Sequence, residues 1–181
     1  MKQAIFKIIK KKQPHAYRNK DALEKVIGYV LRKTARLEDD LWGSIGTFGK
    51  SSSSMIEDFR KVKRLYDKED GLQLKHLILS WGERPDLSRK KMRKLIKRTL
   101  AFWGEEYQLI YAVHEDKLPN GYHMHIVLNS VSNKGNKIQI TSKRLRKFKK
   151  HFNKIWNPYE YILKMNQDTR TIEDKSFECD W

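Results

Sequence analysis

Apolar residues repeat along the chain with two periods, one typical of strands and one typical of helices. Strand-like runs occupy residues 4–9, 42–48, 74–81, 108–114, 123–129 and 137–140. Helical spacing recurs in four segments. They are residues 21–36, the residues that follow a capping box at Ser54–Glu57, the residues from a cap at Asp86 or Ser88 to Gly104, and the residues from Thr141 or Ser142 to Asn157. Because the runs at 108–114 and 123–129 read as a direct hairpin, we predict an α+β fold with a central, mostly antiparallel sheet of about five strands flanked by helices.

The predicted hairpin carries three histidines. Turn chemistry at 119–121 would fold the strand that ends at His114 back against the strand that begins at His123. Successive side chains of a strand point to opposite faces, so His123 and His125 emerge together. The pairing brings His114 beside them. Three imidazoles that meet at one point predict a metal site at His114, His123 and His125.

Length and charge narrow the class of protein and its partner. At roughly 100–200 residues per domain, the chain of 181 residues fits one domain. We expect a single domain over residues 1–181, with the last ~20 residues forming a C-terminal tail or helix. Lys and Arg outnumber Asp and Glu by 39 to 22, and the formal net charge of +17 indicates a polyanionic partner.

Two basic runs are candidates for phosphate contacts. They comprise Lys10, Lys11 and Lys12, and, after the hairpin, Lys143, Arg144, Arg146 and Lys147. A third run at 89–98 decorates the outer side of a predicted helix, and we expect it to be only a solvated face.

Several classes are excluded by what the sequence lacks. No apolar run approaches the ~18–20 residues of a membrane-spanning helix, and the first residues lack the long apolar segment of a signal peptide. We therefore expect a soluble, cytoplasmic protein without membrane insertion. Cys179 is the only cysteine, which excludes an internal disulfide and argues against a cysteine-based zinc site.

Tyr29 lies off the apolar stripe of the helix predicted at 21–36. At 100° per residue it projects roughly 130° from the centre of the stripe, so we expect its side chain to face solvent or a cleft. Tyr29 is the first member of an ordered set of motifs. The others are the strand at 75–81, the segment 114–116 (His-Glu-Asp), the segment 123–125 (His-Met-His) and Asn129.

This ordered set resembles a relaxase, and more narrowly the P-type mobilization family of HUH-type tyrosine endonucleases. The similarity runs from about Ile5 to Trp156. The resemblance implies an HUH relaxase-like fold and site-specific nicking and rejoining of single-stranded DNA at an origin of transfer, for conjugative mobilization of a plasmid or integrative element. Relaxosome accessory proteins and a coupling protein are the further partners that it implies.

The resemblance also assigns roles to residues. Tyr29 matches the attacking tyrosine, which forms a 5′-phosphotyrosine intermediate. The three histidines match the ligands of a divalent metal. Manganese or magnesium is expected from the family, although three imidazoles suit zinc, manganese or nickel better than magnesium. Asp116 matches an acidic residue that either holds the tautomer of a ligand or takes the proton of Tyr29.

Two other functions compete with this interpretation. A rolling-circle replication initiator would share the histidine hairpin but would use a later tyrosine, Tyr159 or Tyr161. A non-catalytic basic nucleic-acid-binding module would use the histidines only for packing. Among the remaining candidates, Tyr17 is the reserve nucleophile, His76 is expected in the core or behind the ligands, and Asn129 is expected in strand-end hydrogen bonding.

Overall fold

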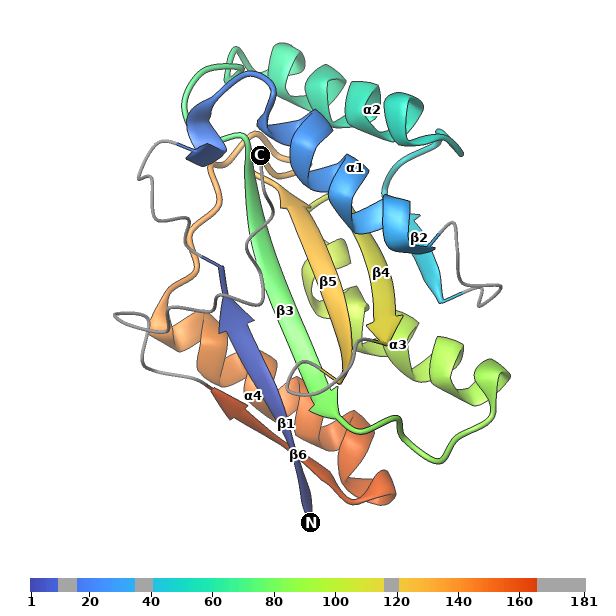
Figure 1. The fold of residues 1–181 in the computed structure, drawn as a ribbon. Coiled ribbons are helices and arrows are strands. Elements are labelled where there is room, and N and C mark those ends of the chain that lie inside the picture. Colours follow the sequence, from blue (N-terminus) through green and yellow to red (C-terminus); the bar gives the residue numbers. More distant parts are fainter. Residues whose placement is uncertain (10–15, 35–40, 116–120, 166–181) are drawn as a thin grey trace.

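The computed structural model of the protein describes residues 1–9, 16–34, 41–115 and 121–165, which form a sheet with helices on both faces (Figure 1). The strands are β1 (Lys2–Ile8), β2 (Trp42–Ile45), β3 (Leu74–Gly82), β4 (Leu109–Glu115), β5 (Tyr122–Asn129) and β6 (Tyr161–Met165). Their order across the sheet is β2-β4-β5-β3-β1-β6. Every neighbouring pair is antiparallel except β1 and β6, which run parallel.

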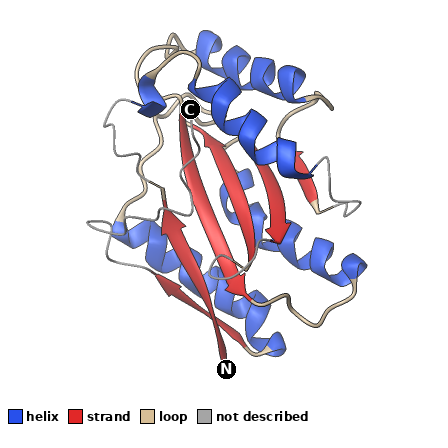
Figure 2. Cartoon of the chain, in the orientation of Figure 1, coloured by secondary structure: helices blue, strands red, loops and turns tan. Residues whose placement is uncertain are grey.

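Two pairs of helices cover the two faces of the sheet (Figure 2). The helices are α1 (Ala22–Thr34), α2 (Ser52–Leu65), α3 (Arg89–Gly104) and α4 (Ser142–Trp156), with short 3₁₀ helices η1 (Ala16–Arg18) and η2 (Asn157–Tyr159). The core of one face contains buried residues of α1 and α2, and the core of the other contains buried residues of α3 and α4. Among the described residues, no helix combines the length and the hydrophobicity needed to cross a membrane.

Strand β5 shows how the sheet separates the two cores. Met124 and Ile126 pack into the core under α3 and α4, whereas Val127 packs into the core under α1 and α2. His123 and His125 share the side of Val127 because side chains alternate along a strand. Every residue of β5 is buried. The sheet therefore presents both histidines on the α1/α2 face, away from solvent.

The fold class is confirmed, and the expected number of strands is corrected. The structure is α+β with a mostly antiparallel sheet, but the sheet has six strands rather than about five. The additional strand is β6 at 161–165, in the region where we expected a tail or helix, and residues 166–181 lie outside the described part of the chain. Residues 137–140 are not a strand, because only an isolated bridge joins Lys137 to Val131.

The start of α2 also differs from the prediction. Ser51, rather than Ser54, is the N-cap: its hydroxyl accepts from the Ser54 N–H at 3.2 Å, and the Ser54 hydroxyl accepts from the Ser51 N–H at 3.0 Å. A run of four serines offers the same hydroxyl at each position, so the pattern alone does not select one. The caps of α3 and α4 are Ser88 and Thr141, each one of two predicted residues.

The buried side chain of Lys63 on α2 should make the stability of the protein depend on pH. The Nζ of Lys63 donates to the main-chain oxygen of Gln73 at 2.6 Å and to the Gln73 side-chain oxygen at 2.8 Å. Burial, assisted by the charge of Arg60, lowers the pKa of Lys63 from 10.5 to about 7. The unfolded chain therefore binds more protons between these two values, and stability rises with pH across that window.

We expect the Lys63 contribution to the free energy of unfolding to rise by roughly 1.4 kcal/mol per pH unit across most of this window. Lys63→Met should remove that slope, and Lys50→Met, which changes an exposed lysine, should retain it. Urea denaturation of the three proteins at a series of pH values between neutral and alkaline measures the difference. Equal slopes for wild type and Lys63→Met would contradict the prediction.

Candidate metal centre and active site

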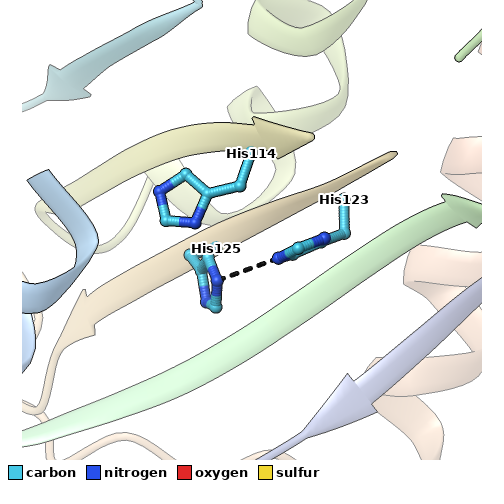
Figure 3. Close-up of side chains that lie close together, drawn as sticks. All are labelled: His114, His123 and His125. Carbon is cyan, nitrogen blue, oxygen red and sulfur yellow. Dashed lines mark hydrogen bonds between the residues drawn. The ribbon is translucent and has the colours of Figure 1, made fainter. Parts of the chain in front are cut away.

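Three histidines meet on the α1/α2 face of the sheet (Figure 3). His114 on β4 and His123 on β5 are direct register partners, and His125 follows two residues later. One ring nitrogen from each histidine lies within 4.8 Å of the others, and the Nε2 atoms of His123 and His125 lie 3.1 Å apart. All three side chains are at most 1% exposed. The hairpin thus brings together the imidazoles that strand alternation predicts to meet.

Backbone carbonyls define the tautomers of two of these rings. His114 Nε2 lies 2.9 Å from the carbonyl oxygen of Val30, and His123 Nδ1 lies 3.0 Å from that of Gly121. A carbonyl oxygen only accepts, so the facing nitrogen carries the proton in each neutral ring. The lone pairs then belong to Nδ1 of His114 and Nε2 of His123, which are the atoms that could bind a metal.

The turn before β5 requires glycine at position 121. Gly121 has φ +54°, and a Cβ built there would lie 1.9 Å from the carbonyl oxygen of Gly82. No other residue fits without moving the backbone. The Gly121 carbonyl oxygen lies 3.0 Å from Nδ1 of His123, so this glycine also orients one imidazole.

The chemistry of the donor set fits a divalent transition metal. Three neutral imidazoles suit zinc, nickel or manganese, whereas magnesium prefers oxygen ligands and retains water. Three protein ligands would leave at least one position open on a metal ion with four or more ligands. The residues present could therefore hold a transition metal ion with an open position.

Tyr29 on α1 lies beside this group. Its ring contacts the ring of His125 edge-on, with 5.8 Å between the centroids. Stripe residues of α1 such as Ile27 and Val30 are fully buried, while Tyr29 is half-buried, as its off-stripe position predicts. The bond from His114 to the Val30 carbonyl joins the same turn of α1 to the histidines. The helix therefore carries Tyr29 to the edge of the candidate metal centre.

The other polar candidates divide into those near the histidines and those used in structure. His76 lies on the same face of β3, and its Nε2 is 2.9 Å from Nδ1 of His125, so it stands behind the three-histidine group, as expected. Asn129 is fully buried, and its Nδ2 donates to the Phe59 carbonyl and to Gln108 Oε1, which confirms the strand-end role. Asp116 lies outside the described residues.

The basic candidates that the structure describes, all on α4, do not lie beside the histidines. Helix α4 packs on the core that contains Met124 and Ile126, which is the opposite face of the sheet. Lys143, Arg146 and Lys147 are exposed there. The guanidinium of Arg144 is engaged instead: it lies 5.1 Å from the rings of Trp103 and Tyr107 and 2.5 Å from Glu106 Oε2. Lys10, Lys11 and Lys12 lie outside the described residues.

Two residues outside the predicted site share a sheet row with His125. Register pairs connect Trp42, Ala112, His125, Ile78 and Lys7 across the sheet, so all five side chains lie on the α1/α2 face. Trp42 is 41% exposed on the edge strand, two strands or about 10 Å from His125. An exposed aromatic residue and a lysine therefore flank the site along this row. The strand alternation of each segment was visible in the sequence, but the register was not.

Fold and site together define a class: an α+β domain with a buried three-histidine group across an antiparallel hairpin and a tyrosine helix laid over it. The chain belongs to the MobA/VirD2-like relaxases, because the family model of the relaxase nuclease domain matches residues 29–161. This match spans the tyrosine, all three histidines and most of the sheet. No curated protein sequence matches the chain significantly.

A solved structure described as "Molecular Basis of Vancomycin Resistance Transfer in Staphylococcus aureus" is similar to the chain at 10% sequence identity. The similarity covers 75% of this chain and 78% of that chain, with a TM-score of 0.44. A likeness of this size adds nothing to the assignment of individual residues.

Proposed function

We propose that the protein nicks and rejoins single-stranded DNA at an origin of transfer, through a 5′-phosphotyrosine intermediate on Tyr29, for conjugative mobilization. The observation that carries the proposal is the 5.8 Å contact between the rings of Tyr29 and His125 in a relaxase-family chain. It brings a nucleophile to the one group of three buried histidines that could hold a metal among the described residues.

The chemistry requires one bond to form and one to break. The Tyr29 hydroxyl oxygen attacks the scissile phosphorus, the bond from phosphorus to the 3′ oxygen breaks, and the 3′ oxygen takes up a proton. Rejoining is the reverse attack by the 3′ hydroxyl. A phenol has an unperturbed pKa near ~10, so it needs a proton acceptor or nearby positive charge. Asp116 is our candidate either for that acceptor or for a residue that orients a ligand histidine.

His114, His123 and His125 are the proposed ligands of a divalent ion, manganese or magnesium by family and zinc or nickel by ligand chemistry. When bound, the ion would polarise a non-bridging phosphate oxygen and offset charge that develops during the reaction. The protein's own contribution is to hold the three rings in defined tautomers and to keep Tyr29 against them. Trp42 and Lys7, on the sheet row of His125, are proposed contacts for a base and a phosphate of the incoming strand.

Further proposals concern organisation and context. We propose that residues 1–181 act as one relaxase domain in the cytoplasm, together with relaxosome accessory proteins and a coupling protein. The rolling-circle alternative is weaker because Tyr159 packs with Trp156 in the core on the other face of the sheet. The non-catalytic alternative makes a different prediction, since it requires neither metal nor adduct.

The test incubates the purified protein with labelled single-stranded origin fragments and manganese, and then denatures the mixture. We expect a denaturant-resistant adduct on the 5′ side of the nick and a free 3′ hydroxyl on the other fragment. Chelation should prevent both. Binding without any adduct, across metals and candidate origins, would favour the non-catalytic module.

Basic residues on α4 are proposed as contacts for the DNA backbone outside the site. Helices α3 and α4 each contain seven Lys and Arg and no Asp or Glu, and they share one face of the sheet. On the other face, described pairs such as Arg60–Glu24 and Arg64–Glu57 offset part of the positive charge. Of the two faces covered by the described helices, the α3/α4 face should therefore attract phosphates more strongly.

We expect Lys143→Glu/Lys147→Glu to lower the affinity for single-stranded DNA by about 10-fold at moderate salt and to reduce the slope of log K against log salt by about 1.4, near 0.7 for each lost phosphate contact. The matched control is Lys20→Glu/Lys50→Glu, which makes the same change of charge at exposed lysines near the starts of α1 and α2. Fluorescence anisotropy over a salt series measures both. Equal effects of the two double variants would indicate net charge rather than a binding face.

A further inference from the structure

A chain of hydrogen bonds runs from the three-histidine group into the core. Nδ1 of His125 lies 2.9 Å from Nε2 of His76, and Nδ1 of His76 lies 3.3 Å from the hydroxyl of Tyr17. His125 is fully buried, and His76 and Tyr17 are 7% and 9% exposed. The chain thus links three residues from β5, β3 and η1 on the face that carries the candidate metal centre.

The direction of these bonds follows from what the centre requires. His125 can bind a metal through Nε2 only if Nε2 holds a lone pair, which places the ring proton of the neutral imidazole on Nδ1. His76 Nε2 must then accept that proton's hydrogen bond. Its own proton is on Nδ1, so His76 donates to the hydroxyl oxygen of Tyr17. Each ring in the chain therefore has one defined tautomer when a metal is bound.

The surrounding contacts hold these rings in place. The ring of His76 stacks on the ring of His125 with centroids 5.1 Å apart and an interplanar angle of 29°. The main chains of His76 and Tyr17 are also held by hydrogen bonds. The His76 carbonyl accepts from the Ile9 N–H at 2.9 Å, and the Tyr17 carbonyl accepts from the Gln73 N–H at 2.7 Å. This hydrogen-bond relay of His125, His76 and Tyr17 is therefore built on the sheet and on η1, which is anchored just before the start of β3.

We propose that His76 and Tyr17 are positioning residues that set the tautomer and the ring orientation of His125 for metal binding. This inference rests on the proposed metal centre and deepens it. It also gives Tyr17 a role other than nucleophile, because the Tyr17 hydroxyl accepts a hydrogen bond within the relay. Neither residue touches the reacting phosphate.

The experiment measures the binding of manganese alone to purified variants by calorimetry. His76→Leu removes the acceptor for His125, and we expect it to weaken manganese binding by about 10- to 100-fold. His76→Gln offers an amide oxygen to His125 and an amide N–H to Tyr17, so it should restore binding to within a few-fold of wild type. Tyr17→Phe removes only the outer partner and should have a smaller effect than His76→Leu.

Matched controls separate positioning from folding. Tyr111→Phe removes the hydroxyl of a tyrosine that is also buried but lies in the core on the opposite face of the sheet, and it should leave manganese affinity unchanged. Melting temperatures of all variants in chelator report the stability of the fold without metal. Nitrogen-15 NMR of the histidine rings in the zinc-loaded protein should place the proton of His125 on Nδ1 in wild type and in His76→Gln.

The outcomes distinguish this inference from the proposed function. Manganese affinity of His76→Leu equal to that of wild type would overturn the relay and leave the three-histidine site standing. Weak binding by both His76→Leu and His76→Gln, with unchanged melting in chelator, would also overturn it. Failure of the wild-type protein to bind any of the candidate ions would overturn the metal site and the relay together.

Discussion

Replacement of Tyr29 by phenylalanine is expected to abolish the covalent protein–DNA adduct and to slow nicking by at least about 10³-fold, because the variant lacks the oxygen that attacks the phosphorus. The aromatic ring remains, so the edge contact with His125 and the packing of α1 should persist. Manganese binding and affinity for the origin strand should therefore stay within a few-fold of wild type. Denaturing gels of the adduct and single-turnover nicking rates measure the effect.

Two further tyrosines serve as matched controls for this result. Tyr159→Phe alters a ring that contacts Trp156 and Lys91 on the opposite side of the sheet, and it should leave the adduct intact. Tyr17→Phe alters the reserve candidate, and it should change nicking only as far as it changes metal affinity. An adduct that survives in Tyr29→Phe and disappears in Tyr159→Phe would show that the nucleophile is Tyr159 on η2 and not Tyr29 on α1.

The parts of the site that could be predicted from sequence depend on local geometry. The meeting of His114, His123 and His125 needs only strand alternation and one turn, both of which lie within the stretch from 108 to 129. The position of Tyr29 off the apolar stripe of α1 follows from the helical period in the same way. Such features can be predicted without knowledge of the rest of the fold, because they depend on few long-range contacts.

The side of the sheet taken by α4 could not be predicted. Phe148 and Phe152 indicate which side of the helix is buried, but either face of a sheet would bury them equally well. The basic run that follows the hairpin closely in sequence consequently lies across the sheet from the histidines. Arg144 shows a second limit, since its stacking on Trp103 joins two helices that the sequence does not pair.

Long-range pairs account for the other differences. Strand β6 forms because Tyr161–Met165 pair with β1, about 160 residues earlier in the chain. This pairing buries Tyr161 and Leu163 on the α3/α4 face. The bond between Tyr17 and His76 spans 59 residues. The strand period places His76 on the correct face of β3, but no local pattern identifies its partners.

Metal removal and histidine replacement form the second prediction with a large expected effect. Chelation of the wild-type protein should lower the nicking rate by about 10²–10⁴-fold, because a bound cation contributes several kcal/mol to the stabilisation of charge in the transition state. Added manganese should restore the rate. At an ion concentration 100 times the dissociation constant, binding adds about 2.7 kcal/mol to the stability, or roughly 5–10 °C in melting temperature for a chain of this size. Differential scanning fluorimetry and nicking assays measure the two effects on the same samples.

Single replacement of His114, His123 or His125 by alanine should remove both the metal-induced rise in melting temperature and the nicking activity. These side chains are buried, so each variant should also lose some stability in chelator through lost packing and hydrogen bonds, and that loss is measured separately. His151→Ala is the matched control, because His151 joins α4 to the Arg98 carbonyl on the opposite face of the sheet and should retain both properties. Full nicking by the chelated wild-type protein would show that the reaction needs no metal. A metal-induced rise in melting temperature that persists in all three alanine variants would show that the ion binds elsewhere. The two results separate because the first tests what the ion does and the second tests which rings hold it.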